Sequence, residues 1–559
     1  MRERSDASLI ASPAAVADNG YGMSRFLIRA RQPWGDGAPV RIVRDADILA
    51  SHLEDAAHFP GGHATELIAP ATEREVADAL RVSDYVLPIG AQSSLTGGAT
   101  PMGERLLSTA RLNRIESIDP VGAPTVRVQA GVTMAALDEA LETQGRYYPP
   151  APTFGGAFVG GTVATNAAGA ATFKYGTTRD WVQAVTVVLP SGDVLDIERG
   201  ETIAHSDGHF DLQLAACRIR VPVPTYRMPD VPKLSAGYFA APEMDLVDLF
   251  IGSEGTLGIV TAVTLRVLPV RPAFCLALIP FQRRRQAMEF VHRLRETSRE
   301  TWHTRNPRGV DVSAIEHLDW RCLDVIREDG LDRVNGVSIP PSAVMALLVT
   351  LELPADTTAA AAFHQIGGAE TERAPDAPLV RFCRMLIEAD VFDDVEIAVP
   401  GDRARALQLL ALREGVPASV NRRVGLAKEH DARIEKTAAD MIVPFDKMEQ
   451  LLEFYDDEFR RRGLDAAVWG HISDGNVHPN VIPRSFADVE SGRAAILAFG
   501  REAIRLGGAP LAEHGVGRNP VKQQLLRELY GEAGIEEMRA VKRAIDPEWK
   551  MAPGVLFQR

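Results

Sequence analysis

Hydrophobic and polar positions follow helix and strand periods in turn along the first part of the chain. Thr72 with Glu75 three residues later is typical of a capping box and predicts a helix that runs to about Val82. An apolar run predicts a strand over residues 85–89. Similar patterns predict a strand over 125–130, an amphipathic helix over 134–144 ended by Gly145, and a hairpin over 184–197 that turns at residues 190–193. The mixture indicates an α+β or α/β protein.

The chain has 559 residues, which is too long for one hydrophobic core. Gly-rich loops stop after Pro269 and Val270, and longer, more charged helical stretches begin. We therefore expect an N-terminal extension over residues 1–50, a first domain over 51–270, a second over 271–467 and a C-terminal segment over 468–559 that packs against the first domain. No internal repeat is visible.

Three segments rich in small residues stand out in the first domain. The first, PIGAQSSLTGGATP from Pro88, follows a predicted strand and offers the backbone N–H groups and hydroxyls that a pyrophosphate needs. It is neither a P-loop nor a dinucleotide GxGxxG that opens a helix. The others are residues 152–182 and residues 248–261. One such loop is typical of an ordinary turn, but three in this order favour a dinucleotide cofactor.

Two histidines near the C-terminus, His471 and His478, flank the turn-forming residues of HISDGNVHPN, and Glu513 and His514 follow in AEHGVG. The turn reverses the chain, so both rings can face one point. Two imidazoles and a carboxylate satisfy a divalent ion such as Zn²⁺ and leave a position open for substrate. Two surface histidines beside a turn would give the same spacing by chance.

Several strings resemble a known family. GHISDGNVHPN, EHGVG and AIDPEWKMAPGVLF resemble the C-terminal part of flavin-linked D-2-hydroxyacid dehydrogenases, the group of D-lactate dehydrogenase, the glycolate oxidase flavin subunit and D-2-hydroxyglutarate dehydrogenase. The segment from Pro88 resembles the pyrophosphate loop of vanillyl-alcohol oxidase-type flavoproteins. The resemblance implies an α+β protein, with a two-subdomain FAD-binding fold of that type and an α+β substrate cap domain. Ser473 departs from the family's usual Gly, and Ala91-Gln92 from its Gly-rich middle.

The resemblance implies a set of FAD-contacting residues in the three segments. These are Pro88, Gly90, Ala91, Gln92, Ser93, Ser94, Leu95, Gly97, Gly98, Pro152, Thr153, Gly156, Gly161, Thr162, Thr165, Asn166, Gly169, Tyr175, Gly176, Glu254, Gly255, Gly258 and Ile259.

The resemblance also implies substrate-binding residues. Arg413 in ALREGV and Lys436 in EKTAADMIVP match the family's cations that grip a substrate carboxylate. Exposed Arg and Lys are abundant, so a solvated face is the alternative for both. Asn480 matches a polar position that faces the substrate, and its alternative is a turn cap.

Together these features imply FAD-dependent, metal-assisted oxidation of a D-2-hydroxy acid to the 2-keto acid. His471, His478 and Glu513 would hold the metal, with Zn²⁺ expected and Mn or Fe as alternatives, and His514 would take the hydroxyl proton. The electron acceptor would be a quinone, a cytochrome or an electron-transfer flavoprotein. An oxidase that uses oxygen is a variant of this hypothesis.

Two alternatives come from other classes. An alkylglycerone-phosphate-synthase-like transferase shares the flavin fold but uses a run of adjacent histidines, which this chain lacks. A metal hydrolase would use the same histidines and leave the three Gly-rich segments unexplained.

Composition narrows the range of partners. The net charge of −14 and the pI of about 5.5 argue against a nucleic-acid-binding surface. The four cysteines, Cys217, Cys275, Cys322 and Cys383, are too far apart for an iron–sulfur cluster. No apolar run is long enough for a membrane span, and acidic residues weaken the faint likeness of the N-terminus to a signal peptide. We expect a cytoplasmic location, with peripheral membrane association as the alternative; a homodimer is left open.

Overall fold

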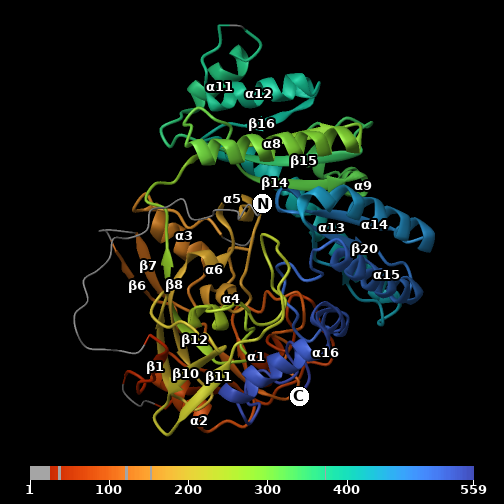
Figure 1. Cartoon of the computed structure of the whole chain (residues 1–559). Coiled ribbons are helices and arrows are strands. Elements are labelled where there is room, and N and C mark those ends of the chain that lie inside the picture. Colours follow the sequence, from red (N-terminus) through yellow and green to blue (C-terminus); the bar gives the residue numbers. More distant parts are fainter. Residues whose placement is uncertain (1–24, 36–38, 120–123, 151–153, 372) are drawn as a thin grey trace.

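The computed structural model describes residues 25–35, 39–119, 124–150, 154–371 and 373–559. These residues form two bodies that lie one above the other in Figure 1. The lower one, the N-terminal body, contains three sheets formed before residue 270. The upper one, the cap, contains one large sheet and its helices. Both bodies combine helices with sheets, which confirms the α+β class.

The sheets of the N-terminal body have the orders β2-β3-β5-β4, β6-β7-β12-β8-β9 and β1-β10-β11. In the first, β3, β4 and β5 are parallel, whereas every pairing in the second is antiparallel. The strands are β1 Leu27–Arg29, β2 Arg41–Val43, β3 Leu67–Ala69, β4 Val86–Ile89, β5 Arg105–Ser108, β6 Ile115–Ile118, β7 Thr125–Gln129, β8 Val182–Val188, β9 Val194–Glu198, β10 His209–Gln213, β11 Arg218–Pro222 and β12 Ile259–Arg266.

Short helices connect these strands. They are α1 Ala46–Ala50, α2 Glu73–Arg81, α3 Met134–Glu142, α4 Val159–Ala164, α5 Thr172–Tyr175, α6 Thr178–Trp181 and α7 Leu246–Phe250. Helix α2 begins as predicted, because the Thr72 hydroxyl accepts from the Glu75 N–H at 3.2 Å. The capping box differs in its other half: the Glu75 carboxylate accepts from the Ala71 N–H, not from that of Thr72.

The cap is built on one antiparallel sheet of order β16-β13-β15-β14-β19-β20-β17, with β18 also paired to β20. Its strands are β13 Ala273–Phe281, β14 Val312–Asp319, β15 Met345–Leu353, β16 Glu396–Ala398, β17 Thr437–Ala438, β18 Met441–Ile442, β19 Ala466–His471 and β20 Asn476–Val481. The central strand β15 is apolar on both faces. Met345 and Leu347 join one hydrophobic cluster and Ala346 and Leu348 another, as the two-residue period of a strand requires.

Helices cover both faces of the cap sheet. Residues of α8, α12, α14 and α15 join one cluster and those of α9 and α13 the other. The helices are α8 Arg284–Thr304, α9 Trp320–Glu328, α10 Leu331–Val334, α11 Ala359–Gly368, α12 Pro378–Glu388, α13 Arg403–His430, α14 Met448–Arg462 and α15 Phe486–Arg505, with 3-10 turns η1 Phe392–Asp394, η2 Phe445–Lys447 and η3 Ile472–Asp474.

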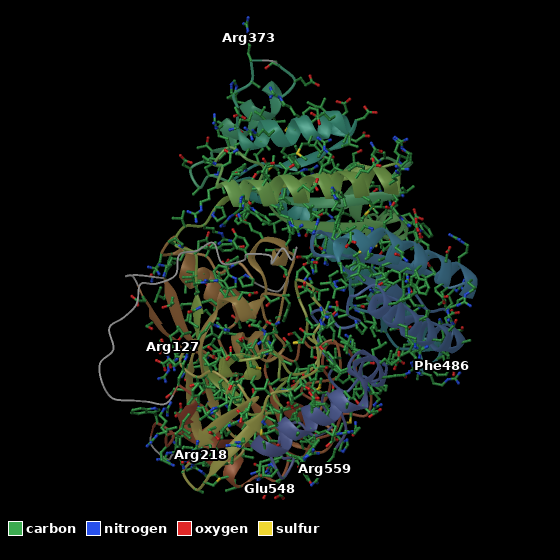
Figure 2. All side chains as sticks on the ribbon, in the orientation of Figure 1. Arg127, Arg218, Arg373, Phe486, Glu548 and Arg559 are labelled. Atoms are coloured by element: carbon green, nitrogen blue, oxygen red, sulfur yellow. The ribbon has the colours of Figure 1, made fainter. Side chains whose placement is uncertain are left out.

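The C-terminal part of the chain belongs to both bodies. Strand β19 spans the expected limit at residue 467, so β19 and β20 are part of the cap sheet. The last helix, α16 Pro520–Ile545, returns to the N-terminal body, where Met538 and Val541 join the core. Figure 2 shows Arg373 at the tip of the cap, and Glu548 and Arg559 at the opposite end of the molecule. The division of the chain into domains stays a prediction.

The hydrophobic pattern locates the other predicted elements of the N-terminal body correctly. The strand, helix and hairpin predicted after residue 120 are β7, α3 and the pair β8–β9. All four cysteines are free thiols, and only Cys217 is exposed. Among the described residues, no helix combines the length and apolar character that crossing a membrane requires.

Candidate active site

A cavity of about 620 Å³ lies where the two bodies meet. All three small-residue segments line it, together with the histidine motifs from the C-terminal part of the chain. The predicted FAD-contacting residues that line it are Pro88, Gly90, Ala91, Gln92, Ser93, Ser94, Leu95, Gly98, Gly161, Thr162, Thr165, Glu254, Gly255, Gly258 and Ile259.

The loop after β4 exposes unpaired donors to this cavity. The backbone N–H groups from Ala91 to Leu95 donate to no acceptor within the described ranges. Gln92 has a positive φ of 51°, and its side-chain amide holds it there by donating to the His52 and Ala99 carbonyls at 2.9 and 2.8 Å. Consecutive free N–H groups form an anion-binding concavity, which suits the pyrophosphate of FAD.

Glycines keep the middle of the cavity open. A Cβ added to Gly161 on α4 would meet nothing within 4 Å, so a side chain there would enter the cavity. Gly255 has φ +72°, and an added Cβ would lie 2.7 Å from Pro88 Cγ. Its neighbour Glu254 ties the third segment to the C-terminal motif, because its carboxylate accepts from the Val516 and Gly517 N–H groups at 2.8 Å each. These residues fit a flat, nucleotide-bearing cofactor.

Some predicted FAD residues lie outside the cavity lining: Gly97, Gly156, Asn166, Gly169, Tyr175 and Gly176. The Tyr175 hydroxyl donates to Glu352 of the cap at 2.6 Å, so it joins the two bodies instead. The Asn166 side chain accepts from the Arg179 N–H at 3.0 Å, and Gly176, with φ 74°, ends α5. Pro152 and Thr153 lie outside the described residues.

The three predicted metal ligands converge. Nε2 of His471 and Nε2 of His478 each lie 3.2 Å from Oε1 of Glu513, and all three side chains are buried. Ligand atoms around a tetrahedral Zn²⁺ are about 3.3–3.5 Å apart, given metal–ligand bonds of about 2.0–2.2 Å. The donors are of a type that divalent cations bind, and all three lie within 4.8 Å of one another.

Strand register explains the position of His471. His471 ends β19 and pairs with Glu316 on β14, so the two side chains share one face of the sheet. Nδ1 of His471 donates to the Glu316 carboxylate, which also accepts from Nε of Arg413 at 2.6 Å. With Nδ1 held by Glu316, Nε2 is directed toward Glu513 and is the nitrogen that would coordinate a cation, as in metal-bound histidines. Burial alone would lower the pKa of His471, but the neighbouring carboxylates raise it to about 9.

Asp440 orients the other two histidines. Its carboxylate lies 3.3 Å from Nδ1 of His478 and 3.5 Å from Nδ1 of His514. It also accepts from the backbone N–H groups of Glu513 and His514 at 2.7 and 2.8 Å. Burial lowers the pKa of His514 to about 4. Its ring, stacked on that of His478 at 5.0 Å, is the more exposed of the two and faces the cavity.

Glu513 is also held by a lysine from the N-terminal body. Nζ of Lys233 lies 2.6 Å from Glu513 and 3.2 Å from Asp474, with no exposure of the Lys233 side chain. Ser473, the departure from the family's Gly, has no positive φ, and its hydroxyl accepts from the Ile315 N–H at 3.2 Å. The substitution is accommodated within the hairpin.

The predicted substrate-binding residues also line the cavity, and they differ in how many of their polar atoms already have a partner. Arg413 uses Nε to hold Glu316, which leaves its two other nitrogens free of hydrogen bonds to described residues. Lys436 has no ion-pair partner among the described side chains, and burial lowers its pKa to about 8. The Asn480 side chain donates to the His478 carbonyl at 2.9 Å, and its Oδ1 is buried without a partner.

Four residues of the site escaped sequence analysis: Lys233, Glu316, Asp440 and Asp474. Two of them belong to stretches of largely apolar residues, SAIEHL around Glu316 and ADMIV around Asp440. A charged residue inside an apolar strand needs a partner, and this is the signal that could have identified them.

The protein families that match this chain are consistent with the geometry of the site. A family described as "FAD binding domain" matches residues 64–198, and one described as "FAD linked oxidases, C-terminal domain" matches residues 273–556. Fold and site thus define a flavin-dependent oxidoreductase. The chain belongs to the FAD-linked oxidase family, whose C-terminal domain covers more than half of it.

The relatives share most of their length with this chain. D-lactate dehydrogenase of Anaerostipes hadrus is 26% identical, over 92% of this chain and 94% of its own. D-2-hydroxyglutarate dehydrogenase of Xanthomonas citri pv. viticola is 28% identical, over 85% and 84%. Among solved structures, alkyldihydroxyacetonephosphate synthase has a TM-score of 0.56 at 14% identity, over 92% of this chain and 83% of that one. At this identity the likeness concerns the fold alone.

Proposed function

We propose that the protein oxidises a D-2-hydroxy acid to the 2-keto acid, using FAD and a divalent cation held by His471, His478 and Glu513, with Zn²⁺ as the expected ion. The main support for the proposal is that one cavity is lined both by the free N–H groups after β4 and by the His–His–Glu cluster. The relatives named D-lactate and D-2-hydroxyglutarate dehydrogenase support this substrate class.

The residues divide the work of binding a 2-hydroxy acid. Lys436 is the unpaired cation for the substrate carboxylate, and Asn480 offers its free Oδ1 to a substrate hydroxyl. Arg413 adds positive charge while it positions Glu316, and through it His471. The substrate is thereby oriented before reaction, which is where much of an enzyme's rate advantage arises.

Oxidation removes a proton and a hydride from the substrate. We assign the proton to Nε2 of His514, because its Nδ1 lies beside the Asp440 carboxylate, which stabilises a proton at that position. A divalent cation held by His471, His478 and Glu513 would supply Lewis-acid chemistry toward the substrate hydroxyl. FAD, when bound, supplies the hydride acceptor. An external acceptor would then reoxidise the protein.

The decisive experiment mixes the oxidised protein anaerobically with D-lactate, D-2-hydroxyglutarate or glycolate and records the visible spectrum. At least one of them should bleach the flavin absorbance, while the L-enantiomers of the chiral acids should not. Rapid bleaching by an L-acid, or none by any 2-hydroxy acid, would contradict the proposal. Repeating the reaction in air distinguishes a dehydrogenase from an oxidase.

Replacing Gly161 with Leu should lower the affinity for FAD. The added side chain would enter the cavity, and such overpacking commonly costs about 1–3 kcal/mol, or a five- to more than hundredfold rise in Kd. Released flavin fluorescence measures the effect. Gly425→Leu is the matched control, since Gly425 also lies on a helix with open space beyond its Cα but is exposed outside the cavity. Equal FAD content in both variants would contradict this assignment.

Replacing Lys436 with Met should weaken substrate binding. Loss of a charge-assisted contact removes roughly 1.5–3 kcal/mol, so the apparent Kd from the concentration dependence of flavin bleaching should rise about ten- to a hundredfold. The exposed Lys447→Met variant is the control. An unchanged Kd in Lys436→Met would assign carboxylate binding to Arg413 instead.

A further inference from the structure

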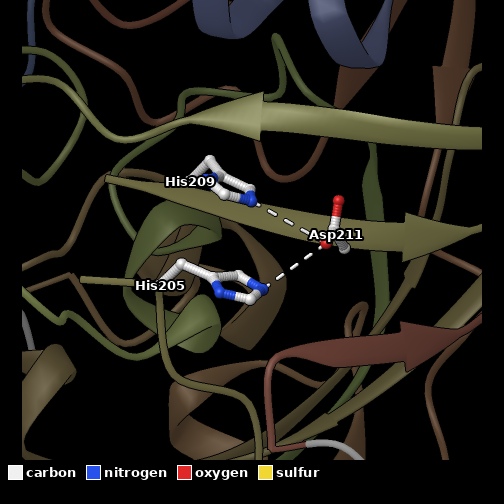
Figure 3. Close-up of side chains that lie close together, drawn as sticks. All are labelled: His205, His209 and Asp211. Carbon is white, nitrogen blue, oxygen red and sulfur yellow. Dashed lines mark ion pairs between the residues drawn. The ribbon is translucent and has the colours of Figure 1, made fainter. Parts of the chain in front are cut away.

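A second cluster of metal-ligating side chains lies in the N-terminal body, apart from the cavity. His209 and Asp211 are two residues apart on β10, so their side chains project from the same face of the strand. His205 precedes the strand. Figure 3 shows both imidazole rings directed toward the Asp211 carboxylate. None of these three residues lines the cavity of the candidate active site.

A tight turn brings His205 beside His209. The Gly208 N–H donates to the His205 carbonyl at 2.9 Å, and the His205 N–H donates to the His209 carbonyl at 2.8 Å. Gly208 has φ +82°, which suits glycine at this turn position. The two rings stack with centroids 4.4 Å apart, and Phe26 stacks on His205 at 4.4 Å. Backbone and aromatic contacts therefore hold both imidazoles in place.

The donor atoms are spaced for coordination. Nε2 of His205 lies 3.4 Å and Nε2 of His209 lies 3.8 Å from Oδ2 of Asp211. Two ligand atoms of a tetrahedral zinc site are about 3.3–3.5 Å apart. All three ligand atoms lie within 4.8 Å of one another, so small side-chain movements could bring them around one ion.

The state of His209 points to a missing partner. Its Nδ1 lies 2.9 Å from the Asp207 carboxylate, which can only accept a hydrogen bond, so Nε2 is the nitrogen available to coordinate a cation. Nε2 is buried without a hydrogen-bond partner, and the side chain is only 8% exposed. A buried polar atom without a partner is unusual, and a cation between Nε2 and the Asp211 carboxylate would supply one.

Two arginines share the Asp211 carboxylate. Nη2 of Arg218 donates to Oδ2 at 2.6 Å, and Nε of Arg220 lies 3.7 Å from Oδ1. Both arginines are more than half exposed, and Arg218 lies at the edge of the N-terminal body in Figure 2. Arg218 can therefore turn toward solvent when a cation approaches. Its competition for the Asp211 carboxylate lowers the affinity of the site for that cation.

We propose that His205, His209 and Asp211 form a second divalent-metal site, specific for a borderline first-row cation such as Zn²⁺. Two imidazoles favour such ions over Mg²⁺ and Ca²⁺, which prefer all-oxygen sites. His205 is 31% exposed, so water can complete the coordination. The ion would fasten the turn before β10 to the sheet β1-β10-β11 and stabilise this edge of the N-terminal body.

The test uses tag-free, chelator-treated holoprotein in which His471 and His478 are both replaced by Ala, so the active-site cluster cannot contribute. Calorimetric titration with Zn²⁺ should give one site per chain, titration with Mg²⁺ none, and Zn²⁺ should raise the unfolding temperature. In this background His205→Ala should remove zinc binding, whereas His364→Ala, at an exposed histidine of α11, should not.

Two further variants separate coordination from folding. Asp207→Ala keeps the three ligands and should weaken zinc binding about ten- to a hundredfold, as loss of an outer-shell partner commonly does. Arg218→Gln should tighten it, because a competing cation is removed. No zinc binding in the double variant, or binding that neither His205→Ala nor Asp207→Ala alters, would overturn the proposal. Since the active-site ligands are absent from the test, the outcome is independent of the proposed function.

Discussion

Replacing His478 with Ala is expected to remove the active-site cation and to lower turnover on the order of a thousandfold, because Lewis-acid polarisation contributes several kcal/mol. Nε2 of His478 lies 3.2 Å from Glu513, and its loss would leave only His471 and Glu513 as ligands. FAD should remain bound, since most of its predicted contacts come from the N-terminal body. Elemental analysis and single-turnover flavin reduction measure the two effects.

The exposed His303→Ala variant serves as the control for histidine loss, because His303 lies at the end of α8, away from the cavity. It should retain both metal and activity. Full turnover by exhaustively chelated wild-type protein, with no metal detected, would show that the His–His–Glu cluster has another role.

Replacing His514 with Ala should lower the rate of anaerobic flavin reduction about 10²- to 10⁴-fold, the usual contribution of a general base. The apparent Kd for the substrate should change far less, since the proton moves only in the transition state. The ring contacts Asp440 and stacks on His478, so metal content must be measured in the same preparation.

Added imidazole gives a readout that a purely structural role would not produce. It can enter the space left by the His514 ring and accept the proton, so it should restore part of the reduction rate in His514→Ala. It should have no such effect on Lys436→Met. An undiminished rate in His514→Ala would refute the proposed base.

Local sequence rules predict the N-terminal body better than the cap. Thr72 caps the start of α2, Gly145 lies in the turn that follows α3, and the apolar period defines β4, β7 and the β8–β9 pair, because each of these signals acts over a few residues. The cap sheet pairs β14 with β19, strands that lie about 150 residues apart in sequence. No local pattern specifies that pairing, so the order of the cap sheet could not be read from the sequence.

The residues of the candidate site also differ in how far local sequence patterns predict them. His471, His478, Glu513 and His514 were identified because they belong to compact motifs that resemble a family. Their partners on other strands and loops were not, since Glu316 meets His471 only through strand pairing.

Tyr175 shows the converse case. It lies within a motif, yet its hydroxyl donates to Glu352 of the cap and does not line the cavity. Proximity in sequence to cofactor-binding residues does not determine which way a side chain projects.

The buried contact between Lys233 and the pair Glu513 and Asp474 has a thermodynamic consequence for the molecule as a whole. The lysine comes from the N-terminal body, Asp474 from the cap hairpin and Glu513 from the segment between α15 and α16. Separating the two bodies would therefore break a buried contact among three charges. A molecule bound in the cavity between the bodies adds contacts to both. Ligand binding in the cavity and the association of the two bodies are therefore linked. Each ligand that binds should raise the temperature at which the bodies separate. Weakening the contact between the bodies should in turn lower the affinity for every ligand.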